Sequence, residues 1–339
     1  MSATAPKDNK PSLAEQRKRT ALVHKAARFA VQIAFFILAP GVFSGAFNGV
    51  KYLFTQLGLG EPIELTAFVM LLIGVLVFTV VFGRFFCGYA CAFGTLGDVL
   101  YTIPEFIRSK TSIPRLRFPL PLVRVLSFCK YIVLACVCIA CFLGVWSAYS
   151  GYSPWVAFSA ALAGSIEGVD QIALVLLGVV AVCMIVRERF FCQFLCPLGA
   201  VFALMPVLGI SELSRTREHC ARSCDRCQHA CPVDIWPDAD KLEHGECIAC
   251  GRCADACPMG NVNLVAIEHA DARKERLEKD GDELRPIRKV RETWRFWRGT
   301  GIVFMLVKAL LFLALCWALG ATRYIPAFSD VVGRLPLPF

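Results

Sequence analysis

Eight cysteines between Cys220 and Cys257 have the spacing of iron–sulfur ligands. They form two runs, Cys-x3-Cys-x2-Cys-x3-Cys-Pro and Cys-x2-Cys-x2-Cys-x3-Cys-Pro. A [4Fe-4S] cluster needs four thiolates around it, and short spacings let three of them come from one turn while the fourth comes from another run. Zinc ligands or disulfides fit less well, because zinc sites rarely use two runs that each close with Cys-Pro. The pattern therefore predicts two [4Fe-4S] clusters and electron transfer as the chemistry.

We expect the two runs to share their ligands crosswise. One cluster would take Cys220, Cys224, Cys227 and Cys257, and the other Cys247, Cys250, Cys253 and Cys231. This is the spacing of a two-cluster bacterial ferredoxin, so we predict a small α+β ferredoxin domain over residues 211–270. Only the first gap departs from the pattern, because three residues rather than two separate Cys220 from Cys224. Cys220 is therefore the ligand with the weakest support.

The composition places this cysteine-rich segment in a membrane protein. Hydrophobic residues make up 56% of the 339 residues, and the mean hydropathy is +0.57. Residues 29–50, 65–83, 131–166, 171–186 and 309–322 contain no Asp, Glu, Lys or Arg, and a spanning helix needs about 20 mostly apolar residues. We predict an all-α integral membrane protein with five transmembrane helices, the fifth extending over residues 299–322 and containing Lys308.

The positive charges predict the orientation in the membrane. Lys and Arg are frequent in residues 1–28 and 84–124, whereas the opposite loops and the carboxy-terminal tail contain only Lys51, Arg323 and Arg334. Positively charged loops stay on the cytoplasmic side, so we place the ferredoxin segment in the cytoplasm and the protein in the bacterial cytoplasmic (inner) membrane. The net charge of +9 then reflects topology. No DNA-binding motif accompanies it, so we predict no nucleic-acid partner.

A second cysteine motif occurs twice. Arg84-Phe85-Phe86-Cys87-x3-Cys91 recurs 105 residues later as Arg189-Phe190-Phe191-Cys192-x3-Cys196, and Gly94 and Gly199 follow three residues after each motif. Each copy contains two apolar stretches that end in the motif, which indicates a duplicated two-helix core. Because two spans preserve direction, both motifs would emerge at the cytoplasmic face of the membrane.

Two interpretations of Cys87, Cys91, Cys192 and Cys196 remain open. Four converging thiols could hold a metal ion or an iron–sulfur cluster at the membrane edge. Alternatively, these small side chains could pack the interface between the two copies, since free cysteine behaves as a small hydrophobic residue.

The order of these features defines the expected domains. They are a cytoplasmic basic tail (1–28), a first membrane repeat (29–105), a second membrane repeat (106–210), the ferredoxin domain (211–270), a charged linker (271–298), the fifth transmembrane helix (299–322) and an outer tail (323–339). Lys308, inside the fifth helix, could meet a quinone oxygen or an acidic group of a partner, or its long stem could carry the ammonium to the interface.

Duplicated membrane cysteine motifs followed by a two-cluster ferredoxin segment resemble the NapH, NosR and RdhC group of membrane-bound polyferredoxins, over roughly residues 25–270. Members carry Cys-x3-Cys-Pro motifs beside the membrane, and Cys196-Pro197 matches, whereas Ala92 follows Cys91. The fifth span departs from the simplest arrangement, and the flavin attachment pattern of NosR-like members is missing. The resemblance implies electron transfer between a quinone pool or cytoplasmic donor and a partner respiratory reductase.

The remaining patterns favour a carrier over an enzyme. None of the five histidines lies inside a predicted span, so paired haem ligands are missing there, and no Walker, Rossmann or Ser-His-Asp pattern stands out. We expect an electron-transfer subunit of an oxidoreductase complex without its own substrate-converting site. The alternative is a redox sensor, or an electron donor for the maturation of a metalloenzyme.

Overall fold

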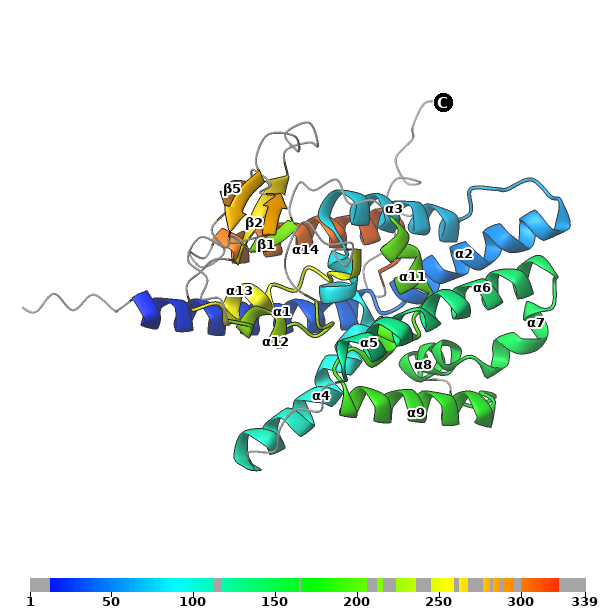
Figure 1. Cartoon of the computed structure of the whole chain (residues 1–339). Coiled ribbons are helices and arrows are strands. Elements are labelled where there is room, and N and C mark those ends of the chain that lie inside the picture. Colours follow the sequence, from blue (N-terminus) through cyan, green and yellow to red (C-terminus); the bar gives the residue numbers. More distant parts are fainter. Residues whose placement is uncertain are drawn as a thin grey trace, which may run out of the picture.

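The computed structural model is mostly helical, with a small sheet beside one end of the helical bundle (Figure 1). It describes residues 13–111, 118–164, 166–205, 212–215, 224–235, 245–258, 262–267, 277–280, 283–286, 290–294 and 300–322. The expected outer tail at 323–339 and the ligand Cys220 lie outside these ranges.

The bundle contains most of the helical elements. They are α1 (Leu13–Leu38), α2 (Val42–Leu59), α3 (Ala67–Phe82), the π-helical turn η1 (Phe86–Ala90), α4 (Ala92–Thr111), α5 (Leu120–Ser127), α6 (Cys129–Phe142), α7 (Trp146–Tyr149), the 3-10 turn η2 (Ser150–Tyr152), α8 (Pro154–Ala163), α9 (Gln171–Val186), α10 (Phe190–Phe194), α11 (Pro197–Leu204) and α14 (Thr300–Ala318). The short helices α12 (Arg226–His229) and α13 (Arg252–Ala256) belong to the cysteine-rich segment.

Five strands accompany the cysteine-rich segment. They are β1 (Glu212–Arg215), β2 (Val262–Ile267), β3 (Leu277–Asp280), β4 (Glu283–Pro286) and β5 (Val290–Trp294). An antiparallel sheet has the order β1-β2-β5, with Glu212 opposite Val265, and β3 and β4 form a separate hairpin. Strands β3, β4 and β5 lie within residues 271–298, where we expected a charged linker. Strand β5 hydrogen-bonds to β2, so this segment is joined to the expected ferredoxin domain by backbone pairing.

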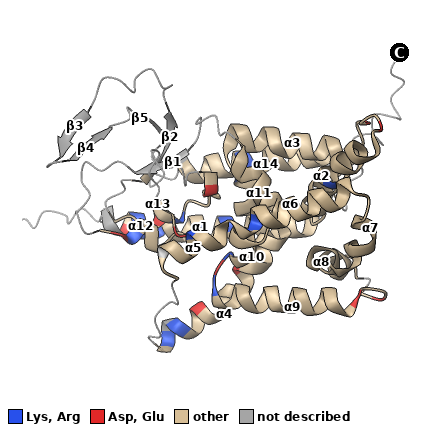
Figure 2. Cartoon of the chain, turned by 45° about the vertical axis from the view of Figure 1, so that its right-hand side comes forward, with Lys and Arg blue, Asp and Glu red and all other residues tan. Residues whose placement is uncertain are grey.

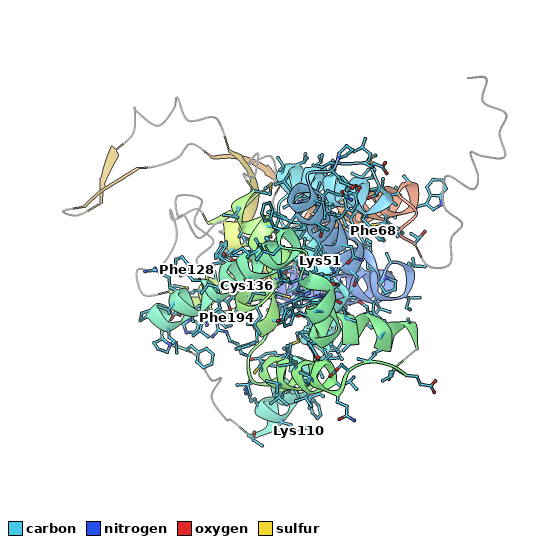
Figure 3. The ribbon with its side chains drawn as sticks, turned by 90° about the vertical axis from the view of Figure 1, so that its right-hand side faces the viewer. Lys51, Phe68, Lys110, Phe128, Cys136 and Phe194 are labelled. Carbon is cyan, nitrogen blue, oxygen red and sulfur yellow. The ribbon has the colours of Figure 1, made fainter. Side chains whose placement is uncertain are left out.

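Three helices in the described part of the chain are long and apolar enough to cross a membrane. They cover Glu15–Leu38, Pro121–Phe142 and Gly301–Ala318, and shorter apolar helices cover Ala67–Phe82, Pro154–Ala163 and Gln171–Val186. Charged residues are coloured along α12, α13 and the far end of α4, whereas α3, α8 and α9 carry almost none (Figure 2). Apolar rings such as Phe68 and Phe128 stand on the outside of the bundle (Figure 3). These features are those of a membrane protein.

Two of the predicted spans are not single helices. The stretch 29–50 is divided between α1 and α2, because α1 ends at Leu38, just before Ala39-Pro40. A residue that precedes proline is forced out of the helical region. The stretch 131–166 is divided in the same way into α6, α7, η2 and α8, with a turn at Gly144 (φ +71°) and a new start at Pro154. The other predicted spans correspond to α3, α9 and α14.

We expected the first helix to follow a basic tail at residues 1–28, but helix α1 begins within that range. It is continuous from Leu13, and His24 and Arg28 are buried in its middle. The His24 imidazole pairs with the Asp255 carboxylate on α13. The basic end of α1 therefore packs against the cysteine-rich segment.

Small residues bring the apolar helices together. A Cβ at Gly49 on α2 would come 2.9 Å from the Leu72 side chain on α3, and a Cβ at Gly74 on α3 would come 2.9 Å from Leu319 just after α14. Close approach at glycine is a common packing device between apolar helices. This packing fixes the end of α3, where the first cysteine motif begins.

Candidate iron–sulfur centre

The first cysteine motif follows a sharp turn at the end of α3. Gly83 has a positive φ of +74°, a conformation that glycine adopts without strain. Cys87 then lies within the turn η1, and Cys91 adopts an extended conformation (φ −74°, ψ 119°) immediately before α4. The Cys91 carbonyl accepts the amide N–H of Thr95 at 2.9 Å. The two cysteines are thus held between two helices.

The second motif repeats this arrangement with small differences. Arg189 has φ +60°, Cys192 lies on the helical turn α10, and Cys196 is extended (φ −73°, ψ 112°) before Pro197 begins α11. The Cys196 Sγ accepts the amide N–H of Gly199 at 3.2 Å. Because Cys91 and Cys196 have nearly the same dihedral angles, Ala92 in place of proline does not change the local geometry.

The four motif cysteines meet in one buried place. Each has a side chain that is 5–6% exposed. Burial raises the pKa of the Cys91 thiol, and the neighbouring thiols of Cys192, Cys87 and Cys196 raise it further. The two copies of the motif therefore face each other, as the repeat predicts. Among the described residues, no three His, Cys, Asp or Glu side chains stand at the spacing of a single metal ion.

The arginines of the two motifs are exchanged between the copies. The Arg189 guanidinium donates to the Cys87 carbonyl and, at 3.4 Å, to the Gly88 carbonyl of the first motif. A Cβ at Gly94 would collide with that guanidinium. In the second motif, a Cβ at Gly199 would lie 3.2 Å from Nη2 of Arg84. Each glycine therefore makes room for the arginine of the other copy.

The two arginines have different acidic partners. Arg189 forms two hydrogen bonds with Asp98 on α4, both at 2.7 Å, and the Gln32 amide donates to the same carboxylate at 2.7 Å. Burial would raise the pKa of Asp98, but Arg189 and then Arg252 lower it below its ordinary value. This paired arrangement lies beside the first cysteine motif.

Arg84 instead shares its carboxylate with a lysine. It donates to Oε2 of Glu246 and to the Gly245 carbonyl, each at 3.1 Å, and the buried Lys130 ammonium contacts the other oxygen of Glu246. Burial would raise the pKa of Glu246, but Arg84 and Lys130 hold it below its ordinary value. Glu246 directly precedes Cys247, so this group of charges joins the bundle to the cysteine-rich segment.

The described cysteines of the predicted ferredoxin domain lie near one another. Burial raises the pKa of the Cys253 thiol, and the neighbouring thiols of Cys250, Cys247, Cys231 and Cys227 raise it further. Cys253 therefore lies near the other members of its predicted ligand set and also near Cys227 of the first set. Cys227 is buried against Ala254 and Val262, with Cys253 and Cys257 packed beside it. Their roles as cluster ligands stay predictions.

The first motif touches the cysteine-rich segment directly. A Cβ at Gly88 would overlap the Ile248 carbonyl oxygen, and the Tyr89 hydroxyl donates to the Cys250 carbonyl at 3.1 Å. At the position of the second motif that corresponds to Gly88, the Gln193 amide donates to the Val233 carbonyl at 2.9 Å. In each copy, the residue that follows the first cysteine therefore contacts a loop of the cysteine-rich segment.

Comparison with known proteins assigns the cofactor. A family described as "4Fe-4S binding domain" matches residues 65–114 and 169–209, which contain the two repeated motifs, and a second family of the same description matches residues 242–262. Similar proteins include an uncharacterised protein of Methanocaldococcus jannaschii (26% identical; 69% of this chain and 85% of that protein). They also include the putative electron transport protein YccM of Escherichia coli (25%; 73% and 70%) and the ferredoxin-type protein NapH of Escherichia coli (24%; 55% and 64%).

The chain is similar to the NapH- and NosR-like polyferredoxins. The predicted resemblance is thereby confirmed, and the comparisons support an iron–sulfur protein that transfers electrons. No solved structure matches the chain significantly.

Several residues around the motif cysteines were not singled out by the sequence. Asp98, Glu246 and Lys130 are ordinary charged residues in the sequence, and their partners lie 91–162 residues away. A usable signal was present only for the arginines, which stand at the same place in both copies of the motif.

Lys308 on α14 is buried against other residues of the chain. Its ammonium donates to the Phe82 carbonyl at 3.4 Å and lies 4.5 Å from the centre of the Phe304 ring. With 4% of its surface exposed, the side chain reaches the end of α3, next to the first motif.

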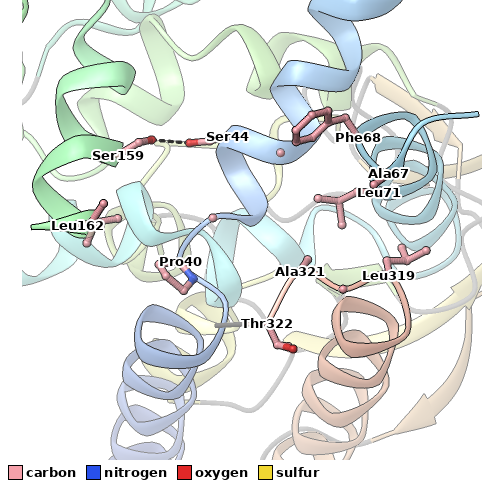
Figure 4. Close-up of a pocket in the computed structure, with 14 residues that line it drawn as sticks. Pro40, Ser44, Ala67, Phe68, Leu71, Ser159, Leu162, Leu319, Ala321 and Thr322 are labelled. Carbon is pink, nitrogen blue, oxygen red and sulfur yellow. Dashed lines mark hydrogen bonds between the residues drawn. The ribbon is translucent and has the colours of Figure 1, made fainter. Parts of the chain in front are cut away.

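An apolar cavity of about 420 Å³ lies where α2, α3, α8 and the end of α14 approach one another (Figure 4). Ser44 and Ser159 form a hydroxyl pair at 2.6 Å in its wall. The ring of Phe43, next to Ser44, lies 5.6 Å from that of Phe93, which stacks on Phe191 at 4.4 Å. Aromatic side chains thus connect the cavity wall to residues beside Cys91 and Cys192.

Proposed function

We propose that this polyferredoxin carries electrons between two [4Fe-4S] clusters in its cytoplasmic ferredoxin segment and a third iron–sulfur site at the membrane edge. Cys87, Cys91, Cys192 and Cys196 would hold the third site. The observation that carries the proposal is the direct contact of Gly88 and Tyr89 with the loop Ile248–Cys250. This contact places a residue adjacent to Cys87 against a predicted ligand of the ferredoxin segment.

The residues at the membrane edge suit an iron–sulfur cluster. Thiolates are the usual ligands, and a bound cluster supplies one-electron transfer. The four side chains are buried, and the guanidinium groups of Arg84 and Arg189 balance negative charge nearby. Tightly packed rings such as Phe93 and Phe191 keep water away. The chain itself therefore supplies ligands, exclusion of water and compensating charge.

We retain the predicted topology of five membrane crossings as part of this proposal. The basic residues of 1–28 and 84–124 would keep both motifs and the ferredoxin segment in the cytoplasm. The helix α14, which approaches both α3 and the cysteine-rich segment, would be the fifth crossing.

The proposed electron partners are a quinone and a respiratory reductase. A quinone head is a flat apolar ring with two carbonyl oxygens, which the apolar cavity and the Ser44–Ser159 hydroxyl pair would suit. Replacing Ser159 by Leu would fill the cavity. We expect this variant to slow quinol-dependent reduction of the clusters at unchanged iron content, whereas Ser147→Leu, at an exposed position outside the cavity, should not. Equal rates in both variants would remove the cavity from the electron path.

The decisive experiment is the iron and sulfide content of anaerobically purified protein. Two [4Fe-4S] clusters account for about 8 irons and a third cluster for about 12. We expect about 12 in the wild type and about 8 when Cys87, Cys91, Cys192 and Cys196 are all replaced by Ser. The matched control replaces Cys129, Cys136, Cys138 and Cys183, none of which is fully buried, and should retain about 12. About 8 irons in all three proteins would exclude the membrane-edge cluster.

A deletion strain separates respiratory electron transfer from the maturation of a metalloenzyme. If the polyferredoxin carries respiratory electrons, its partner reductase will remain assembled and metal-loaded but lose quinol-dependent turnover. Loss of the mature reductase itself would instead favour the maturation role.

A further inference from the structure

Arg84 lies between two groups of cysteines. On one side its guanidinium hydrogen-bonds to the Cys87 side chain and packs against Gly199 of the second motif. On the other side it binds Glu246 and the Gly245 carbonyl, directly before Cys247. The side chain is 2% exposed, so water screens its charge little.

The positive charge around Arg84 is only partly neutralised. Arg84 and Lys130 are both buried and share the single carboxylate of Glu246. At the other arginine of the repeat, Arg189 engages Asp98 in a two-point pair. The group Arg84–Glu246–Lys130 therefore retains one net positive charge, and we call it the cationic triad.

We propose that the cationic triad raises the reduction potential of the membrane-edge cluster, with Arg84 as the positioning residue that brings the charge to Cys87. The inference rests on the proposed function, because it requires a cluster on the four motif cysteines. Reduction adds one electron, supplied by the adjacent ferredoxin segment or a quinol, and hence one negative charge beside the triad. A fixed buried cation stabilises that added charge by Coulomb's law, and hydrogen bonds to cysteine sulfur have the same effect on the potential.

The test is a potentiometric titration of the purified, iron-loaded protein followed by electron paramagnetic resonance. In Arg84→Gln, we expect reduction at the membrane-edge site to become about tenfold less favourable, which corresponds to about 59 mV for one electron. Glu246→Gln should shift the potential in the opposite direction, because it leaves both cations uncompensated. Arg84→Lys should stay closer to the wild type. Lys110→Gln, at an exposed position on α4, is the matched control and should leave the potential unchanged.

The opposite signs of Arg84→Gln and Glu246→Gln distinguish charge from structure. A purely structural role would predict shifts of the same sign in both variants, or loss of iron in both. If Arg84→Gln fails to load iron, Lys130→Gln provides the same test, because Lys130 contributes charge to the triad through Glu246. Loaded Lys130→Gln protein with an unshifted potential would overturn the inference.

The experiment also separates this inference from the proposed function. If the wild type lacks a resonance that disappears on replacing the four motif cysteines by Ser, the membrane-edge cluster does not exist and the proposed function fails. If the resonance is present and its potential is the same in the wild type, Arg84→Gln and Glu246→Gln, only the role of the cationic triad fails.

Discussion

The two copies of the Arg-Phe-Phe-Cys motif share a spacing but have different surroundings. The first copy lies against the loop Ile248–Cys250, and its arginine joins a group with an excess positive charge. In the second copy, Arg189 is paired with one carboxylate, and Gln193 holds the Val233 carbonyl. The equivalent cysteines of the two copies therefore occupy similar positions. The surroundings of the arginines differ, because Arg84 belongs to a group with an excess positive charge, whereas Arg189 is held in an ion pair.

The largest effect expected from this difference concerns Arg189. Replacing it by Ala would leave the buried Asp98 carboxylate without its two guanidinium hydrogen bonds, and breaking a buried ion pair costs about 3–5 kcal/mol. Arg84→Ala should cost less, because Lys130 still neutralises Glu246. Denaturant unfolding of the detergent-solubilised protein measures both free energies. Equal losses would show that the two arginines play the same structural part.

The glycines of the two copies should also differ. Gly94→Ala would drive a methyl group into the Arg189 guanidinium, which Asp98 holds in place. Gly199→Ala would place its methyl 3.2 Å from Arg84 and 3.1 Å from the Cys192 carbonyl, a tight contact without overlap. Overpacking costs about 1–3 kcal/mol, and we expect Gly94→Ala at the upper end and Gly199→Ala at the lower. Thermal unfolding and iron content test the order, and a larger loss for Gly199→Ala would contradict it.

A smaller effect is expected where the second copy holds the ferredoxin segment. Gln193→Ala removes the hydrogen bond to the Val233 carbonyl, which is worth about 1 kcal/mol. We expect faster proteolytic release of the cysteine-rich segment from the bundle. Gln171→Ala, at an exposed position at the start of α9, serves as the control. Unchanged proteolysis of Gln193→Ala would mean that this hydrogen bond does not help to hold the segment against the bundle.

The smallest effect should come from giving the first motif the proline of the second. Ala92 is the first residue of α4, where proline is tolerated, and the extended Cys91 before it is compatible with a following proline. Ala92→Pro should therefore change stability by less than about 1 kcal/mol, with unchanged iron content. A loss of iron would show that the two motifs require different backbones despite their similar angles.

The sequence predicted the cysteine chemistry and the repeat because both depend on local spacing. The offset between Cys87 and Cys192 and the runs that begin at Cys220 and Cys247 can be read directly. The helices α3, α9 and α14 were also predicted near their observed positions, since α3 and α9 are uninterrupted apolar stretches and α14 is interrupted only by Lys308.

The helix breaks, the ion pairs and strand β5 were not predicted, because the number of uncharged residues in a stretch does not indicate them. Ala39-Pro40-Gly41 and Gly144 interrupt two apolar stretches although neither contains a charge. The pairing of Arg189 with Asp98 and of Arg84 with Glu246 joins residues that are 91 and 162 positions apart, and nothing in their local sequence names the partner. The strand β5 was likewise missed, because its charged sequence resembles a solvated linker.

The exchange of arginines between the copies has a consequence for biogenesis. The first cysteine motif is synthesised long before Arg189 and Glu246, the residues that occupy its neighbourhood in the finished protein. The contacts around the first motif are therefore complete only after Arg189 and Glu246 have been synthesised. If Cys87, Cys91, Cys192 and Cys196 hold the proposed cluster, its ligand set is complete only after Cys196 has been synthesised, so we expect the cluster to be inserted late in the assembly of the chain.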